Sequence, residues 1–453
     1  MAETAEERTL THATSTDERQ GGEGGVANIS PSHRRYILML LLVVSTLNFL
    51  DRQIINILVE PIKQDLHLAD WQRGMLTGLS FALFYSVLGL PIARLADRSN
   101  RPIIIGVSLL AWSGFTALCG IANSFAHLLL ARVGVGCGEA GGGPPSHSLI
   151  ADFTTPQNRA SALAYFSLGS PIGTLLGLGL GAVVADAFGW RMAFFIAAAP
   201  GIILAVLLMA TVKEPRNLRA LEGKPKASIK DAWIELKSKR TFWWICFAGA
   251  ATSVATYGQG AFWSSFFLRV HGDEISTLSP AGTGPLVLVG VSLGLVKGLS
   301  GVAGVITGGL ITDRLARRDL RSYCSVPAIA LLLASPAFVL VMLAPGFVMA
   351  AGLLILPVFL SSLIFGPSFA AVQTLVSPGT RATAAAILLF ILTLTGLGLG
   401  PLFIGICSDI FSASLGSAEG LRWALLLTAP ANLIAGLAFW RARRTIVQEL
   451  ELD

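Results

Sequence analysis

The stretch Ala93-Arg94-Leu95-Ala96-Asp97-Arg98-Ser99-Asn100-Arg101 indicates the fold of this chain more directly than any other segment. It closes the apolar run 72–96, and a second stretch, Gly309-Leu310-Ile311-Thr312-Asp313-Arg314-Leu315-Ala316-Arg317-Arg318, closes the run 287–312. Each contains an Asp-Arg pair with another arginine three residues later. A motif that returns at the same place in two sets of apolar runs indicates an internal repeat. The sequence therefore predicts two similar halves, the alternative being two ordinary basic loops.

The composition is that of a protein with many membrane-spanning segments. Of 453 residues, 53% are hydrophobic and only 13% are charged, with a mean hydropathy of +0.68, whereas about a quarter of a soluble domain is charged. The 33 Lys and Arg residues outnumber the 27 Asp and Glu residues. These bases lie between apolar runs and form no single patch, so we expect no nucleic-acid partner.

The apolar runs are numerous enough for about twelve crossings, since a transmembrane helix needs about 20 residues. We therefore predict an all-α integral membrane protein. The expected crossings lie near 36–59, 72–96, 102–122, 126–150, 159–186, 190–212, 241–269, 287–312, 322–344, 346–375, 380–409 and 420–441.

One long charged interruption, 213–240, divides these crossings into two sets of six. It is dense in Lys and Arg, as a cytoplasmic linker would be. The chain before the first crossing is polar and has no apolar core to bury, which favours disorder. The expected organisation is a disordered cytoplasmic tail over 1–33, six-helix bundles over 34–212 and 241–445, the linker over 213–240 and a cytoplasmic tail over 446–453.

The distribution of bases predicts the orientation, because cytoplasmic loops carry an excess of Lys and Arg. With the N-terminus inside, the cytoplasmic side collects the arginines of 94–101, 314–321 and 441–444 together with the linker. The outer side receives far fewer bases, chiefly Lys63, Arg73, Arg191, Arg269 and Arg422. We expect a multi-pass protein of the inner (plasma) membrane with both termini in the cytoplasm.

Two adjacent charges, Asp51 and Arg52, lie inside the first apolar run. A charge at the bilayer centre costs at least about 2.5–3.5 kcal/mol, so such residues indicate an ion or substrate pathway. The alternative is that the two neutralise each other near the outer edge of the span. Neighbours on a helix point about 100° apart, however, so each charge needs a partner elsewhere.

The basic loops after the second and eighth runs, together with Arg132-Val133-Gly134-Val135-Gly136-Cys137-Gly138-Glu139 on the fourth, resemble the major facilitator superfamily. The resemblance covers residues 34 to 445. It implies a fold of two six-helix bundles that rock against each other around a central site. Ala93 stands where the superfamily loop usually has Gly, and Pro102 where a base is common.

The N-terminal half more narrowly resembles the Spinster family of lipid transporters. The residues that carry this likeness are Asp51-Arg52, Leu95 to Arg101, Gly138-Glu139-Ala140, Pro145 and Ile150-Ala151-Asp152-Phe153. The resemblance implies amphiphilic substrates such as lysolipids and sphingoid phosphates. The C-terminal half matches only at the level of the superfamily.

The spacing of the charged residues predicts that they meet. Glu139 lies 13 residues before Asp152 and Asp51 lies 16 residues after Arg35, which places both carboxylates about 20–24 Å above the cytoplasmic end. If the first and fourth spans face each other, as in the superfamily, Asp51, Arg52, Glu139 and Arg132 form one buried cluster. Paired carboxylates in an apolar site are typical of proton exchange. We expect Asp51 and Glu139 to bind the coupled proton and Arg52 to pair with Glu139.

Other polar residues are weaker candidates. For Arg132, binding to loop carbonyls near the outer face is an equal alternative to a charge relay. For the others, helix packing or anchoring at the membrane surface is the alternative. The expected substrate or charge-relay residues are Arg52, Arg132, Asn48, Tyr85, Tyr165, Tyr257, Gln259 and Lys297. The expected cytoplasmic gate consists of Asp97, Arg98, Arg101, Asp313, Arg314 and Arg317.

The predicted function is proton-coupled secondary transport of an amphipathic, lipid-like or hydrophobic organic substrate by alternating access. A small organic anion or a drug-like compound is the alternative substrate, and a receptor or channel is the alternative class. No P-loop, nucleophile elbow or metal triad occurs in the sequence, so we expect neither an enzyme nor a cofactor. The expected partners are the substrate, protons and the lipid bilayer, with the chain acting as a monomer.

Overall fold

The computed structural model describes residues 30–96, 98–154, 156–215, 229–377 and 380–450, and every regular element in these ranges is a helix. The N-terminal group comprises α2 (Pro31–Leu66), α3 (Asp70–Gly74), the π-helical η1 (Met75–Leu79), α4 (Ser80–Ala96), α5 (Arg101–Gly120), α6 (Phe125–Glu139), α7 (Gly143–Phe153), α8 (Pro156–Ser167) and α9 (Gly169–Thr211).

The C-terminal group follows a helix, α10 (Ile229–Ser238), in the predicted linker. The group comprises α11 (Arg240–Val270), α12 (Gly272–Leu278), α13 (Pro285–Ala316), α14 (Ser322–Met342), α15 (Phe347–Ser362), α16 (Phe365–Thr374), α17 (Arg381–Leu392), the π-helical η3 (Thr393–Leu399), α18 (Gly400–Leu415), α19 (Ser417–Leu426) and α20 (Ala429–Leu450).

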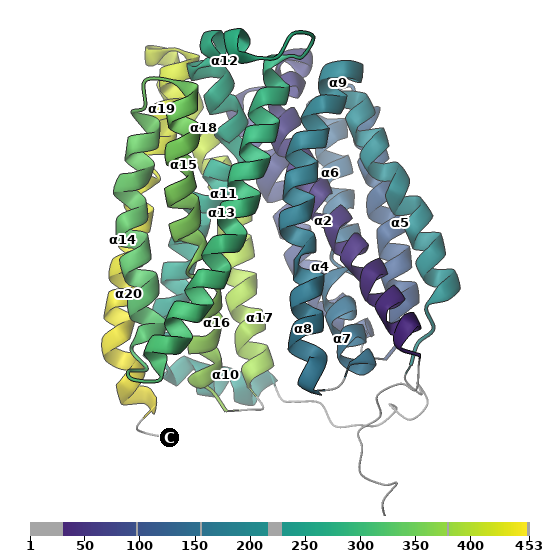
Figure 1. The fold of residues 1–453 in the computed structure, drawn as a ribbon, viewed down its shortest axis with the longest axis vertical. Coiled ribbons are helices and arrows are strands. Elements are labelled where there is room, and N and C mark those ends of the chain that lie inside the picture. The colour runs from purple at the N-terminus through teal and green to yellow at the C-terminus, as the bar shows by residue number, and fades with distance from the viewer. Residues whose placement is uncertain (1–29, 97, 155, 216–228, 378–379, 451–453) are drawn as a thin grey trace, which may run out of the picture.

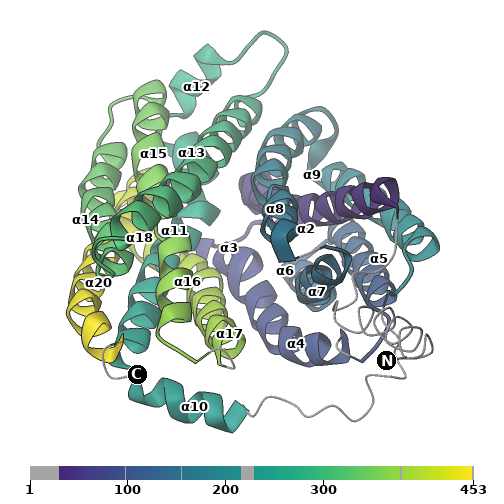
Figure 2. The same cartoon turned by 60° about the horizontal axis from the view of Figure 1, so that its bottom comes forward.

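The two groups lie side by side with their long helices running in one general direction (Figure 1). Turning the molecule shows the N-terminal group on one side and the C-terminal group on the other, with α10 beside the latter (Figure 2). We call the two ends of the molecule the α10 end and the α12 end. Most of the predicted tail 1–33 and part of the linker lie outside the described residues. In the predicted tail 446–453, α20 continues as far as Leu450.

Nine helices in the described residues are long and apolar enough to cross a membrane. One of them, Ser161–Thr211, contains two predicted crossings. The backbone turns between them at Gly189, where φ is 81°, and glycine adopts this conformation readily. Two further predicted crossings fall outside the nine. The first is divided into α6 and α7, and the second, α11, carries many Ser, Thr and Gly residues. With these, the expected twelve crossings are accounted for.

The fourth crossing is interrupted after Glu139. α6 ends at Glu139 and α7 begins at Gly143, because Pro144 and Pro145 have no backbone N–H to continue the helical ladder. Glycines hold α6 close to its neighbours: a Cβ on Gly138 would lie 2.6 Å from the backbone nitrogen of Trp112 on α5. This packing fixes Glu139 inside the N-terminal group at the end of a helix.

The two groups approach closely through glycines near the α12 end. A Cβ on Gly405 of α18 would clash with the carbonyl oxygen of Asp70 on α3. A Cβ on Gly290 of α13 would lie 2.5 Å from the carbonyl oxygen of Leu178 on α9. Small residues of this kind allow helix backbones to approach within a membrane. The N-terminal and C-terminal groups are therefore in backbone contact toward the α12 end.

Candidate functional site

Arg52 and Glu139 form a buried ion pair between α2 and α6. Nε of Arg52 lies 2.6 Å from Oε2 of Glu139, and the Asn48 amide donates a hydrogen bond of 2.8 Å to the same oxygen. The Glu139 side chain is 0% exposed and that of Arg52 is 18% exposed. Oε1 of Glu139 is buried and accepts no hydrogen bond from a described residue. The predicted partner of Arg52 is thus in place, and one carboxylate oxygen has no donor.

Aromatic rings surround the Arg52 guanidinium. Its Cζ lies 4.5 Å from the ring centre of Tyr85, 4.8 Å from that of Phe81 and 5.4 Å from that of Phe49. A cation over aromatic faces gains about 0.5–2 kcal/mol per contact, more when it is desolvated. Arg52 therefore has a second source of stabilisation that does not depend on the charge of Glu139.

Asp51 points away from Arg52, as adjacent helical positions require. The side chain of Asp51 is buried, and its Oδ2 accepts a hydrogen bond of 3.3 Å from the Thr116 hydroxyl of α5. Oδ1 is also buried, without a donor among the described residues. The two carboxylates of the predicted proton pair, Asp51 and Glu139, therefore each have one unpaired oxygen inside the N-terminal group.

Arg132 lies in the same region but binds a backbone carbonyl. Its Nε donates to the Leu76 carbonyl oxygen at 3.3 Å, and its Cζ lies 5.4 Å from the Phe81 ring that also faces Arg52. Leu76 belongs to the π-helical η1, whose wider turn disturbs the usual pairing of carbonyls. Among the described residues, no carboxylate lies within 4.0 Å of the Arg132 guanidinium. Arg132 therefore binds a backbone carbonyl and forms no ion pair with a described residue.

Two other predicted site residues extend the cluster toward the C-terminal group. Tyr257 of α11 is partly exposed and interacts electrostatically with Arg52. Lys297 of α13 reaches across to α2, where its Nζ lies 3.5 Å from Oε1 of Gln53, next to Arg52 in sequence. Both groups of helices therefore contribute polar side chains beside the Arg52–Glu139 pair.

The structure does not bring Gln259 and Tyr165 to this cluster. Gln259 donates a hydrogen bond of 2.8 Å to Thr428 inside the C-terminal group, because its face of α11 packs against the start of α20. Tyr165 is exposed on α8 and lines a separate cavity near the α10 end. The expectation that these two residues belong to the same substrate or charge-relay set as Arg52 is therefore corrected to these separate positions.

The predicted gate residues that the structure describes form no ion pair between the two groups at the α10 end. Arg101 is fully buried and pairs within the N-terminal group, with Glu214 at 2.5 Å and Asp152 at 2.6 Å. Asp97 lies outside the described residues. No ion pair between described residues joins the two groups at this end. The remaining gate residues, Arg98, Asp313, Arg314 and Arg317, are exposed.

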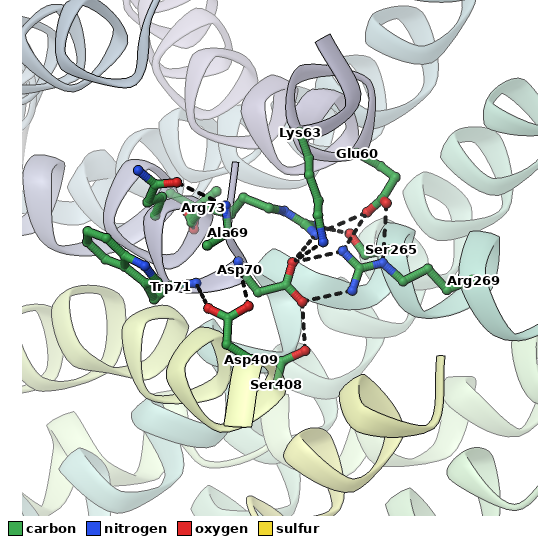
Figure 3. A network of polar contacts seen from close by, with 12 residues as sticks. Glu60, Lys63, Ala69, Asp70, Trp71, Arg73, Ser265, Arg269, Ser408 and Asp409 are labelled. Carbon is green, nitrogen blue, oxygen red and sulfur yellow. Dashed lines mark hydrogen bonds and ion pairs between the residues drawn. The ribbon is translucent and has the colours of Figure 1, made fainter. Parts of the chain in front are cut away.

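A dense charge network joins the two groups at the other end (Figure 3). Asp70 of α3 is at its centre: Arg269 of α11 binds both oxygens of this carboxylate at 2.8 Å. Arg73 contacts Asp70 at 2.7 Å and also pairs with Glu60 at 3.1 Å. The bridging network, as we call it, comprises Glu60 and Lys63 of α2, Asp70 and Arg73 of α3, Ser265 and Arg269 of α11, and Ser408 and Asp409 of α18.

Asp409 adds a backbone contact to the bridging network. Its two carboxylate oxygens accept hydrogen bonds from the backbone N–H groups of Asp70 at 2.9 Å and Trp71 at 2.8 Å. A carboxylate at this position satisfies the unpaired donors at the start of α3. The C-terminal group therefore caps a helix of the N-terminal group, and the cap is lost if the two groups separate at this end.

Sequence reasoning missed the bridging network. It treated Lys63, Arg73 and Arg269 only as bases on the side with fewer positive charges. The sequence does contain a signal for this network, because acids lie at the same ends of the spans as these bases, namely Glu60, Asp70 and Asp409. In the described part of the chain, no group of three or more His, Cys, Asp or Glu side chains could hold a metal ion. In the bridging network, Glu60 and Asp70 bind arginines and a lysine, and Asp409 binds backbone N–H groups.

Comparison with known proteins relates this chain to membrane transporters. The family model described as Major Facilitator Superfamily matches residues 41–397. An MFS-type efflux pump of Mycolicibacterium smegmatis is 34% identical over 416 residues, covering 90% of this chain and 94% of that protein. A sphingosine-1-phosphate transporter of Danio rerio is 26% identical over 416 residues, covering 87% of this chain and 81% of that protein.

A solved structure is similar over nearly the whole chain. It is a bacterial homolog of the human lysosomal transporter Spinster, in an inward-facing and unoccupied conformation. The two share 30% sequence identity and superpose with a TM-score of 0.82, covering 93% of this chain and 99% of that one. The likeness therefore includes both groups of helices.

Replacing Arg269 by Gln should destabilise the protein by about 3 kcal/mol, the lower end of the range for breaking a buried ion pair, because the two carboxylates it binds keep other bases. The matched control is Arg191→Gln, which removes a more exposed arginine from its pair with Asp65 and should cost no more than about 1 kcal/mol. Fluorescence-monitored unfolding in detergent measures both. Equal effects of the two substitutions would show that the bridging network contributes no more than a surface pair.

Proposed function

This chain belongs to the Major Facilitator Superfamily of transporters, and from that premise we propose that it is a proton-coupled secondary transporter of amphipathic organic substrates. As a member of a transporter family, it is not an enzyme. The observation that carries the proposal is the buried Arg52–Glu139 pair, in which one acid oxygen is unpaired and the base is held by aromatic rings. A purely structural ion pair needs neither feature.

Glu139 and Asp51 are the proposed proton-binding groups. Each carboxylate is buried and has one oxygen without a hydrogen-bond donor among the described residues. A proton can therefore bind to either group without displacing an existing hydrogen bond to that oxygen. Thr116 and Asn48, which donate to the other oxygens, hold the carboxylates in place during the exchange.

Arg52 is the proposed link between proton and substrate. When Glu139 takes a proton, the ion pair at 2.6 Å loses its negative partner. Because a lone guanidinium in an apolar site is costly, the anionic headgroup of a substrate becomes a favourable replacement. The aromatic contacts keep Arg52 in position for that headgroup. Proton and substrate then influence each other without sharing an atom.

The two groups of helices are the proposed halves of an alternating-access cycle. The bridging network closes the α12 end, which the distribution of bases assigns to the outer face. At the α10 end no ion pair between described residues joins the groups. This arrangement corresponds to an inward-facing state, the conformation given for the similar bacterial structure. In the opposite state we expect Asp97, Arg101, Asp313 and Arg317 to form the cytoplasmic latch.

The proposed substrate has a charged head and an apolar body. The sphingosine-1-phosphate transporter supports a lipid with an anionic head, and the efflux pump supports export of a hydrophobic organic compound as the second candidate. Arg52 and Lys297 supply positive charge near the boundary between the halves. The proposed setting is the inner (plasma) membrane, with both termini cytoplasmic and the chain acting as a monomer.

Neutralising either proposed proton-binding group should abolish accumulation driven by a pH gradient. Asp51→Asn and Glu139→Gln keep the size of the side chain but cannot carry the negative charge. In proteoliposomes with an imposed gradient, uptake of lysophospholipids, sphingoid phosphates and hydrophobic dyes should fall to the level of protein-free liposomes. Glu419→Gln, at an acid in a local pair with Arg422, is the control and should accumulate substrate normally. Normal accumulation by both neutralised variants would remove Asp51 and Glu139 from the mechanism.

Arg52→Lys should weaken coupling more than folding, since lysine keeps the charge but loses the planar fork. In the wild type, the affinity for an anionic substrate should rise as the pH falls, because protonation of Glu139 frees Arg52. One coupled proton allows a slope of at most about tenfold per pH unit. Binding measured from pH 5 to pH 8 should give a flatter curve for Arg52→Lys. Superimposable curves would leave Arg52 as a structural counter-ion only.

A further inference from the structure

A second polar cavity lies at the α10 end of the N-terminal group, away from the Arg52–Glu139 pair. It has a volume of about 270 Å³ and lies between the start of α2, the end of α7 and one side of α8. Arg34 precedes Arg52 by 18 residues on the same helix, a separation of about 27 Å along its axis. The polar residues that line the cavity are Arg34, Thr154, Asn158, Ser161 and Tyr165.

The cavity contains hydrogen-bond donors that no described residue uses. Nε of Arg34 is buried and has no hydrogen-bond partner. The side chains of Asn158, Ser161 and Tyr165 are exposed, and they have no partner in the described part of the chain. Leaving a buried donor unpaired costs about 1–3 kcal/mol, and more when the group is charged. A ligand that accepts a hydrogen bond from Nε of Arg34 would recover that free energy, and the exposed donors beside it could bind the same ligand.

The charges around the cavity favour a negative ligand. Arg34 has no carboxylate within 4.0 Å among the described residues, and Arg159, which follows the lining residue Asn158, is exposed. Arg159 donates to the carbonyl oxygen of Ala151 and forms no ion pair with a described residue. A guanidinium beside hydroxyl and amide donors suits an anion with several acceptor oxygens, above all a phosphate group.

The size of the cavity limits what can enter it. Sites for drug-sized molecules measure about 300–1,000 Å³, so a cavity of about 270 Å³ accommodates a headgroup and not a whole amphiphile. Leu38 and Ala162 form its apolar part. Tyr165 and the nearby Leu168 are exposed, which provides an apolar surface next to the donors along which an acyl chain can lie.

We propose that Arg34, Asn158, Ser161 and Tyr165 form a binding site for a phosphate-type anion, distinct from the central site. The anion is either the headgroup of a membrane phospholipid or a free phosphate. When occupied, the site links the start of α2 to α8 through one ligand. It does not depend on proton coupling or on the identity of the transported substrate.

The test is ligand-dependent thermal stability of the full chain in a neutral detergent. Dioctanoyl phosphatidic acid should stabilise the wild type, whereas dioctanoylglycerol, which lacks the phosphate, should not. Arg34→Gln should weaken the apparent affinity for phosphatidic acid about tenfold, the effect of losing one charge-assisted hydrogen bond. The matched control is Arg35→Gln, which removes the same charge from the exposed neighbouring position and should leave the affinity unchanged.

Inorganic phosphate distinguishes the two sources of the anion. If millimolar phosphate stabilises the wild type and competes with phosphatidic acid, the site accepts free phosphate; if it does neither, the site requires the lipid. Tyr165→Phe, with Tyr323→Phe as its control, provides a milder variant should Arg34→Gln fold poorly, and should weaken binding severalfold. Wild-type affinity in Arg34→Gln and Tyr165→Phe, or equal losses in Arg34→Gln and Arg35→Gln, would overturn the proposal.

Discussion

The ion pair between Arg52 and Glu139 is the interaction on which the interior of the N-terminal group depends, because Arg52 lies in a helix long and apolar enough to cross a membrane and the Glu139 side chain is fully buried beside it. Replacing a buried pair by apolar residues is often neutral or stabilising, while removing one partner is costly. Such a pair is therefore weak evidence for stability alone. The arrangement around it, with an unpaired oxygen on the acid and aromatic rings around the base, suits a pair that separates during function.

Buried charges also need partners at the two ends of the molecule, and the partners lie in different places at each end. At the α12 end, the buried charges of the bridging network are paired across the boundary between the helix groups, and Asp409 caps α3 from the opposite side. At the α10 end, the buried Arg101 is paired within one group. Separating the groups at the α12 end therefore breaks ion pairs and a helix cap, whereas separating them at the α10 end breaks no ion pair between described residues. This difference favours the state in which the two groups are in contact at the α12 end.

The Arg52–Glu139 pair could be predicted from the sequence, because the constant rise of a helix gives the depth of each residue below the membrane surface. Asp51 and Glu139 were expected at similar depth, and Arg52 was expected to turn toward Glu139; the structure has the Arg52–Glu139 contact. These predictions need only the periodicity of a helix and the chemistry of single residues.

The residues that sequence reasoning misplaced depend on how separate helices rotate and pack. Gln259 turns toward Thr428, which lies 169 residues later in the chain, and no periodic pattern specifies that rotation. The bridging network joins residues up to 339 positions apart, and each of its members resembles an ordinary charge at the end of a span. For Arg132 the sequence left a backbone carbonyl and a charge relay as equal alternatives. The carbonyl that it binds lies in a π-helical turn, an irregularity that apolar periodicity does not reveal.

The central claim is that the two groups of helices move against each other between two states, and distances at both ends test it most directly. Spin labels at the exposed positions His127 and Ser414 report on the α12 end, and labels at the exposed positions Arg94 and Arg318, outside the proposed latch, report on the α10 end. Pulsed electron paramagnetic resonance in proteoliposomes, recorded from pH 5 to pH 8, should reveal a second population in which the first distance is longer and the second is shorter. A single fixed distance at each end, or changes in the same direction at both, would contradict the account.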